Sequence, residues 1–203
     1  MTGEAGTRKA VVHPRVGRPR DSSLQERLLR AAREELTDRG VAGFSMRSVA
    51  KRAGVARSSL LLRWTEAEAL IVDAIDAIVL PEIPELPGTL RGDLLVLLGA
   101  IADQMGTETM DLQMRVMADA SSNPELLARF QERLLHPTAR RFAEVLQAAV
   151  DRGELAADVD RALLADSLVG IVYIRTMASP KRRPPGPQAR RTLIDRMLRM
   201  VQR

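Results

Sequence analysis

The segment PEIPELPG, residues 81–88, is the feature that most constrains the fold, because it holds three prolines in eight residues. Proline lacks a backbone N–H and restricts the residue before it, so this segment cannot be helical. On both sides of it, apolar residues recur every three or four positions, and no stretch alternates with a period of two. We therefore expect an all-α protein in which residues 81–88 form a linker between two helical parts.

Four helices are expected before the linker. The first begins at the capping residues 21–23 and ends near Gly40. One of its faces carries an apolar stripe, formed by Leu24, Leu28, Ala32 and Leu36. Two short helices follow at 46–53 and about 56–64, and a fourth spans about 66–79.

Five helical patterns follow the linker. They cover residues 89–105, 108–121, 124–151, 159–178 and 188–202. Pro137 falls inside the longest of them, so we expect that segment to bend or split there.

Composition excludes several function classes. The chain has no cysteine, which rules out disulfides, thiolate metal sites and cysteine nucleophiles. Its two histidines, His13 and His136, are not part of a catalytic or metal-binding motif, and Glu34 and Glu35 are read as an exposed helix pair. With no apolar signal segment or membrane-length apolar run, we predict a cytoplasmic protein that is not an enzyme and needs no metal or cofactor.

Charge is distributed unevenly along the chain. Residues 1–65 hold 14 Lys and Arg against 6 Asp and Glu, whereas the remainder holds 17 basic and 20 acidic residues. A basic module on a mildly acidic body indicates a polyanionic partner such as nucleic acid. An ordinary solvated surface is the alternative that charge alone leaves open.

The two short helices have the proportions of a helix-turn-helix. Gly54 allows the positive φ of a tight turn, and the small residues around it allow close packing. Leu60 and Trp64, four residues apart, should face the core. The opposite face then offers Arg and Ser donors for phosphates and guanines, and Leu61 and Leu62 for thymine methyl groups, as a recognition helix in a major groove requires.

Residues 17–71, GRPRDSSLQERLLRAAREELTDRGVAGFSMRSVAKRAGVARSSLLLRWTEAEALI, resemble the N-terminal DNA-binding domain of TetR-family transcriptional regulators. The resemblance rests on the Gly-Phe-Ser corner at 43–45, Arg-x-Val-Ala at 47–50, Ala-Gly-Val at 53–55, and the spacing of Leu60, Trp64 and 68–70. The later segments LRGDLLVLL, SSNPELLARF and AAVDRGELAADVD are similar to the helical C-terminal domain of one branch of that family. The resemblance implies a homodimeric regulator, in our reading a repressor, that binds a palindromic operator and responds to an apolar or amphipathic small molecule.

The expected organisation follows from the resemblance and the linker. It comprises a disordered basic arm at 1–20, a helix-turn-helix domain at 21–65, a connecting helix at 66–80, the linker at 81–88, and a ligand-binding and dimerisation domain at 89–203. The predicted DNA-binding residues are Ser45, Arg47, Lys51, Arg57, Ser58, Ser59, Leu61, Leu62 and Arg63, with Arg18 and Arg20 of the arm. The arm is read as a minor-groove hook, or alternatively as a solvated basic tail.

Two positions depart from the family pattern. Family members usually have Tyr at the position of Leu61 and often Lys at that of Ala67, and both residues typically hold backbone phosphates. In one reading, Leu61 and Leu62 contact thymine methyl groups while arginines hold the backbone. In the other, the chain is a helical sensor dimer that has lost strong DNA binding.

A ligand pocket and a dimer interface are predicted in the C-terminal part. The methionine-rich stretch 105–117 either lines an adaptable apolar pocket or is simply core. The candidate pocket residues are Met105, Met110, Met114 and Met117, and the resemblance adds Leu97, Ile101, Phe142 and Leu146. Residues 162–178 are apolar on nearly every side, as in a central helix of a monomer or at a dimer interface. The resemblance favours the dimer, with candidate contacts Leu164, Leu168, Ile171, Val172, Arg175, Leu193 and Met197.

Overall fold

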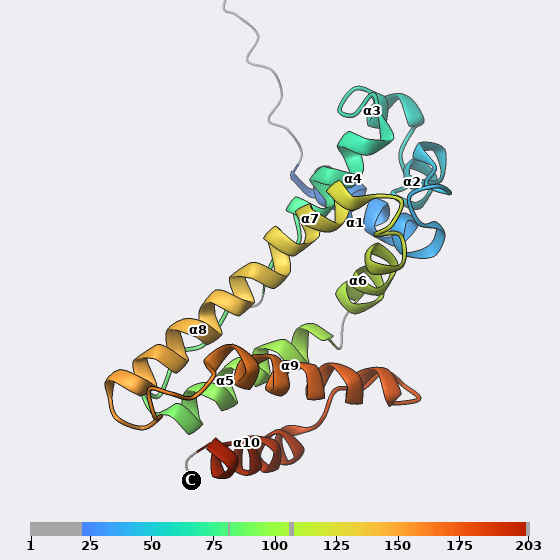
Figure 1. Cartoon of the computed structure of the whole chain (residues 1–203). Coiled ribbons are helices and arrows are strands. Elements are labelled where there is room, and N and C mark those ends of the chain that lie inside the picture. The colour runs from blue at the N-terminus through green and yellow to red at the C-terminus, as the bar shows by residue number, and fades with distance from the viewer. Residues whose placement is uncertain (1–21, 81, 106–107, 202–203) are drawn as a thin grey trace, which may run out of the picture.

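A computed structural model describes residues 22–80, 82–105 and 108–201 (Figure 1). All regular secondary structure within these residues is helical, which confirms the all-α prediction. The elements are α1 Ser22–Arg39, α2 Met46–Arg52, α3 Arg57–Leu61, α4 Ala67–Asp76, α5 Leu90–Met105, α6 Glu108–Ala118, α7 Pro124–Phe130, the π-helical turn η1 Gln131–Leu135, α8 His136–Asp151, α9 Arg161–Ala178 and α10 Pro187–Val201.

Helices α1 to α4 form an N-terminal unit around their own core. The predicted stripe of α1 points into it, since Leu28 and Ala32 are fully buried and Leu24 packs against the same cluster. Leu60 of α3 and Leu70 of α4 complete the centre of this core. Leu36, the last residue of the stripe, is buried as well, but in a second cluster.

This second cluster, which contains Leu36, joins the N-terminal unit to the rest of the molecule. Leu36 of α1 and Ile75 of α4 pack there against Val116 of α6 and Phe130 of α7. Figure 1 shows α6 and α7 lying against the N-terminal unit, with α1 beside them. Because the contact is apolar and buried, a displacement of α6 or α7 acts directly on α1 and α4.

The C-terminal body has a third core. Leu94 and Leu98 of α5 pack with Leu146 of α8, Leu168 of α9 and Ile194 of α10. Helices α9 and α10 lie at the end of the molecule farthest from α2 and α3 (Figure 1). The fold therefore separates the helix-turn-helix from the last two helices by the length of the body.

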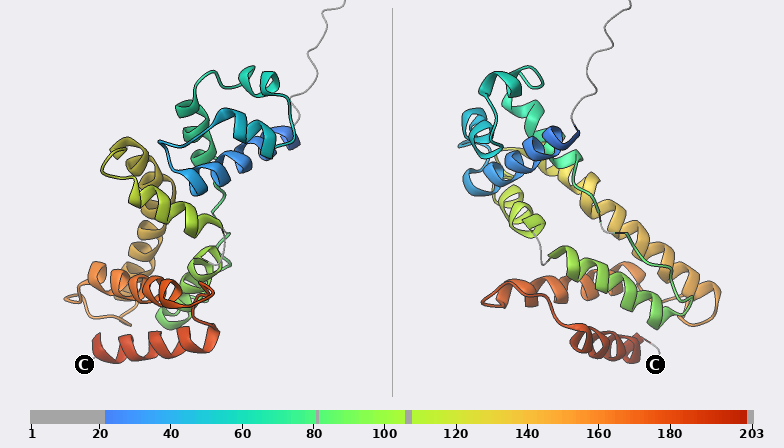
Figure 2. Two further views of the ribbon diagram at one scale, coloured as in Figure 1. Left: turned by 90° about the vertical axis from the view of Figure 1, so that its right-hand side faces the viewer. Right: turned by 180° about the vertical axis from the view of Figure 1, so that it is seen from behind.

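The linker begins earlier than expected. Helix α4 ends at Asp76 instead of Val79, and the chain then runs without helix along α8 (Figure 2). The guanidinium group of Arg133 donates a hydrogen bond to the carbonyl of Ile78 (2.7 Å). This bond satisfies a backbone acceptor beyond the end of α4 and ties the start of the linker to η1.

Pro137 is accommodated without a break in the rod formed by α7, η1 and α8 (Figure 1). The turn just before it is π-helical, and the His136 N–H donates to the carbonyl of Gln131, five residues back. A π turn widens the helix where the regular ladder fails, as it must where proline provides no N–H. The predicted split does not occur, because the segment stays helical through Pro137 and the irregularity is confined to the π turn before it.

Candidate DNA-binding surface and effector cavity

The turn between α2 and α3 has the geometry expected of a helix-turn-helix. Ser45 begins α2, with its Oγ accepting a hydrogen bond from the Ser48 N–H (3.3 Å). After α2, Gly54 has a φ of +67°, and the Val55 N–H donates to the carbonyl of Ala50 (3.0 Å). Glycine adopts this φ without strain, so the sharp reversal before α3 follows from one residue.

Two anchors orient α3. Leu60 is fully buried and Trp64 nearly so, and the Trp64 indole N–H donates to Asp73 Oδ2 of α4 (2.7 Å). The prediction that both face the core is confirmed. Leu62, at the helix end, is 87% exposed, and Leu61 beside it is exposed as well. An apolar pair left in solvent beside Arg57 is unusual for a surface whose only role is solvation.

The predicted DNA-binding residues fall into three groups. Those exposed are Arg47, Lys51, Arg57, Ser58, Leu61 and Leu62, and those partly buried are Ser45, Ser59 and Arg63. Arg18 and Arg20 lie outside the described residues. The hydroxyl of Ser45 accepts the α2 cap bond but can still donate. Contact of these residues with DNA stays a prediction.

Glu35 corrects the reading of an exposed acidic pair, because it is fully buried. Its Oε2 accepts hydrogen bonds from Ser48 Oγ (2.6 Å) and Arg52 Nε (3.0 Å), which fasten α2 to α1. The Arg52 guanidinium also bonds Asp38, and this bond is the main reason that its pKa is raised. Arg52 is thus occupied by acidic partners, unlike Arg47, Lys51, Arg57 and Arg63, which form no ion pair within the described residues. In the sequence, Glu35 lies three residues after Ala32 and seven after Leu28, so it is on the same helix face, and this spacing indicates that it is buried.

The last turn of α1 is held by α6. Arg115 Nε donates to the carbonyl of Thr37 (3.0 Å), and Asp119 Oδ2 accepts from the Val41 N–H (3.1 Å). A cation at the carbonyl end of a helix is favourable because the unpaired carbonyls carry partial negative charge. Between these bonds, Gly40 has a φ of +67°, and a Cβ there would lie 2.6 Å from Asp119 Oδ2. The junction therefore depends on glycine at this position.

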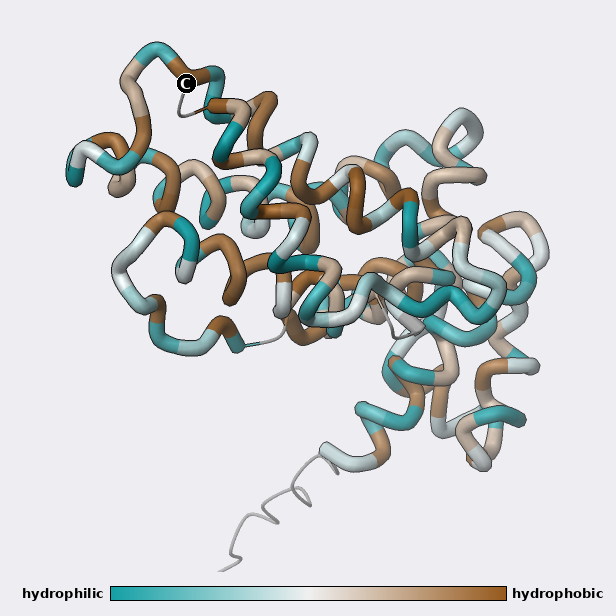
Figure 3. The backbone as a smooth tube through the Cα atoms, turned by 90° about the horizontal axis from the view of Figure 1, so that it is seen from below, coloured by the Kyte–Doolittle hydropathy of each residue, from teal (hydrophilic) through white to brown (hydrophobic). Residues whose placement is uncertain are grey.

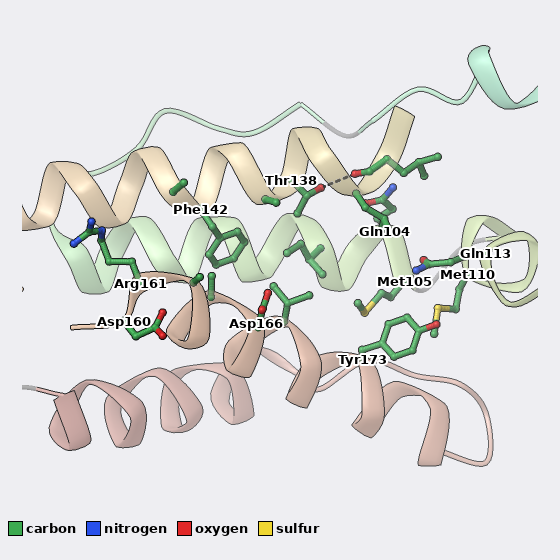
Figure 4. Close-up of a pocket in the computed structure, with 18 of the residues that line it drawn as sticks. Gln104, Met105, Met110, Gln113, Thr138, Phe142, Asp160, Arg161, Asp166 and Tyr173 are labelled. Carbon is green, nitrogen blue, oxygen red and sulfur yellow. Dashed lines mark hydrogen bonds between the residues drawn. The ribbon is translucent and has the colours of Figure 1, made fainter. Parts of the chain in front are cut away.

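A cavity of about 800 Å³ lies among α5, α6, α8 and α9 (Figure 4). Four of the eight predicted pocket residues line it, namely Ile101, Met105, Met110 and Phe142. Gln104, Gln113, Thr138 and Tyr173 add polar groups that the sequence prediction missed. Only the folded chain brings these separate helices together, so no local pattern could have identified them.

The other four predicted pocket residues do not line this cavity. Leu97 lines a smaller pocket of about 130 Å³ beside it. Leu146 is fully buried in the core of the body, and Met117 is exposed. Met114 and Met117 instead offer their sulfurs to the Tyr173 hydroxyl, at 3.1 Å and 3.9 Å. The methionine stretch therefore contributes to the cavity only through its first members.

The predicted dimer contacts on α9 need correction. Leu164, Leu168 and Val172 are buried in the chain's own core, so they cannot also contact a second chain. The exposed apolar residues of α9 lie on its other side: Leu163, Ile174 and Met177. Periodicity could not distinguish the two sides because α9 is apolar nearly all round.

The remaining predicted dimer contacts are at least partly accessible. Arg175 is exposed, and Ile171, Leu193 and Met197 are partly buried. On α10, the helix that ends at the C mark in Figure 3, apolar and polar positions alternate, and Met200 is exposed. Within the part of the chain that the structure describes, none of the helices has the length and hydropathy for a membrane span.

Comparison with known proteins agrees with this geometry. Residues 28–74 match the family model "Bacterial regulatory proteins, tetR family", and residues 84–197 match "Tetracyclin repressor-like, C-terminal domain". An uncharacterized HTH-type transcriptional regulator of Mycobacterium tuberculosis is 29% identical over 178 residues, which cover 87% of this chain and 85% of that protein. A DNA-binding transcriptional repressor TetR of Mycobacteroides abscessus is 31% identical over 142 residues, 68% of this chain and 74% of that protein.

The fold is also similar to that of a TetR transcription regulator from Haloarcula marismortui. The two share 15% sequence identity with a TM-score of 0.65, over 89% of this chain and 98% of the other. The helix-turn-helix and the helical body together define a DNA-binding transcriptional regulator. This chain belongs to the TetR family. Since that family is not enzymatic, the prediction that the chain is not an enzyme is confirmed.

Proposed function

We propose that this regulator is a homodimeric repressor, which binds a palindromic operator through α3 of each chain and releases it when a small molecule enters the cavity. The observation that carries the proposal is the exposed face of α3. Arg57, Ser58 and the apolar pair Leu61 and Leu62 lie on it, while Leu60 is buried on the opposite side. This combination suits a major groove, which presents phosphates, base acceptors and thymine methyl groups together.

The basic residues around α3 are assigned to the DNA backbone. Arg47 and Lys51 of α2 are exposed, and Arg63 follows α3. None of the three forms an ion pair within the described residues, whereas Arg52 nearby is paired with acidic side chains. Cations without protein partners remain available for phosphates and make the binding salt-dependent.

The proposed dimer uses the outer side of α9 together with α10. Leu163, Ile174 and Met177 lie on one face of α9, and Met200 is exposed on α10. Large apolar residues gathered on one face indicate an interaction surface. A second copy of the chain, related by a two-fold axis, would cover this face and present two α3 helices to half-sites about 34–36 Å apart.

Helix α6 is the proposed route from cavity to DNA. Met110 and Gln113 line the cavity, whereas Arg115, only two residues further on, holds the carbonyl of Thr37 in α1. A helix positioned between a ligand and α1 can change the separation of the paired α3 helices. The ligand does so only if it binds one arrangement more tightly than the other.

Selection of bound sequences from a random DNA duplex pool tests the proposal. We expect enrichment of a palindrome with two half-sites one helical turn apart. Enrichment of an unpaired site would contradict the dimer. An absence of any enrichment would favour the alternative function, a sensor dimer whose Leu61 and Ala67 have cost it strong DNA binding.

A further inference from the structure

The charged side chains in the cavity wall differ in whether they have hydrogen-bond partners. Three charged residues line it, all on or next to the first turns of α9. Asp160 caps that helix by accepting a hydrogen bond from the Leu163 N–H (2.9 Å), and the Arg161 guanidinium donates to the carbonyl of Ala157 (3.3 Å). Asp166 forms no hydrogen bond or ion pair with any described residue. Among the described residues of the cavity wall, Asp166 is therefore the carboxylate without a described partner.

The surroundings of Asp166 are largely apolar. In Figure 4 its side chain projects from α9 into the space below α8, from which Phe142 and Thr138 point toward the same space. Val169, three residues on, and Ala162, four residues back, line the cavity on the same side of α9. Asp166 itself is exposed, at the open side of the cavity, so a cation bound beside it would form a partly exposed ion pair.

The far end of the cavity is neutral and polar. Tyr173 lies seven residues after Asp166, two helical turns or about 10 Å along the axis. Burial raises the pKa of the Tyr173 hydroxyl, which stays a neutral group with Met114 sulfur as its acceptor. The side-chain amide of Gln113 makes no hydrogen bond with a described residue. This end offers hydrogen bonds without charge.

We propose that the effector is an organic cation, with an ammonium-like group at Asp166, an apolar body about 10 Å long and a neutral polar far end. Phe142, Met105 and Met110 are placed to contact the body, and the aromatic ring of Phe142 also favours a nearby cation. An anionic effector is disfavoured because the described wall holds two carboxylates, Asp160 and Asp166, against the single cation Arg161. The inference rests on the proposed function, because it takes this cavity as the effector site.

Three probes with one alkyl chain test the charge preference on the full chain by calorimetry: octyltrimethylammonium, 1-octanol and octanoate. We expect the cation to bind about two- to fivefold more tightly than the alcohol, the advantage of one partly exposed ion pair. Octanoate should bind most weakly. Asp166→Asn should remove the cation's advantage and leave octanol unchanged. Asp103→Asn, the same change at an exposed residue of α5 outside the cavity wall, should alter neither.

Each failure has a separate meaning. Octanol or octanoate binding as tightly as the cation, or an unchanged cation affinity in Asp166→Asn, overturns the charge assignment and leaves the cavity as an effector site. Lack of binding by all three probes overturns both the assignment and the effector role. If the cation binds through Asp166 but operator affinity is the same with and without it, the charge preference stands and the proposed ligand response fails.

Discussion

Trp64 shows how one side chain orients the DNA-reading surface. Its indole N–H bonds Asp73 of α4, and with buried Leu60 it fixes which side of α3 faces the core. Arg57 and Leu61 are then left on the outer side. The sequence could predict this arrangement because a short amphipathic helix has only one apolar side to bury.

Arg57→Ala should weaken operator binding by about tenfold or more, because each of two half-sites loses a charged donor. Arg57 is exposed and has no ion pair in the described structure, so the melting temperature should change little. Fluorescence anisotropy with a labelled operator and thermal melting measure the two effects. The control is Arg140→Ala, which removes an exposed arginine of α8. Equal operator affinity in both variants would refute the role of α3.

Leu61→Tyr should strengthen operator binding about two- to twelvefold for each half-site if a phosphate contact is missing, since a neutral hydrogen bond contributes roughly 0.5–1.5 kcal/mol. Leu61 is exposed, so the larger ring can be accommodated without repacking the core. Leu61→Phe adds the ring without the hydroxyl and serves as the control. If Leu61→Tyr binds more weakly than the unaltered chain, leucine itself is the better contact, as expected for a thymine methyl group.

Among the helix contacts, the junction of α1 with α6 connects the N-terminal unit to the C-terminal body, so a shift of α6 would also move α1. Gly40 lies at this junction, with a positive φ and Asp119 Oδ2 only 2.6 Å from the place of a Cβ. A substitution there strains the backbone and also displaces the Asp119 carboxylate from its bond with the Val41 N–H. A substitution at a glycine with a similar φ but open surroundings would produce only the backbone strain.

Gly40→Ala should lower the free energy of unfolding by about 1 kcal/mol more than Gly153→Ala. Both glycines follow a helix end with similar φ, +67° and +74°, but nothing lies within 4 Å of a Cβ at Gly153. Denaturant unfolding measures both variants. Because Asp119→Ala alone removes the Val41 bond, the double variant Gly40→Ala/Asp119→Ala should lose less than the sum of the two single variants. Equal losses in Gly40→Ala and Gly153→Ala would show that the junction is not tight.

Local patterns predicted elements better than they predicted which sides those elements bury. The turn at Gly54 and the disturbance at Pro137 each follow from one residue's backbone chemistry. The inner side of α9 could not be chosen in advance, because Leu163 and Val172 lie on opposite sides and are both apolar. The cavity was found only in part, because Asp166 and Tyr173 belong to a helix read as an interface.

At the scale of the whole molecule, the proposed dimer surface and the recognition helix lie at opposite ends (Figure 1). A small rotation at α9 and α10 would therefore displace α3 through a large arc. Operator binding would then be sensitive to slight changes in the body, without any change within the helix-turn-helix itself. This geometry suits a regulator in which effector and DNA sites do not touch.

Ile174→Glu should convert the dimer to a monomer, because it places a charge in the proposed apolar interface. Ile174 is 63% exposed in the single chain, so folding should tolerate the change. Val79→Glu, at an 85% exposed residue outside α9 and α10, is the matched control and should remain dimeric. Sedimentation measures the mass of each. A monomeric unaltered chain would contradict the dimer proposal outright.

The central claim is that two copies of α3 read one operator, and a hydroxyl-radical footprint on the selected duplex tests it most directly. Two protected patches are expected on one face of the DNA, about one helical turn apart, and both should need about tenfold more protein in Arg57→Ala. A single protected patch, or two patches that persist unchanged in Arg57→Ala, would contradict this claim.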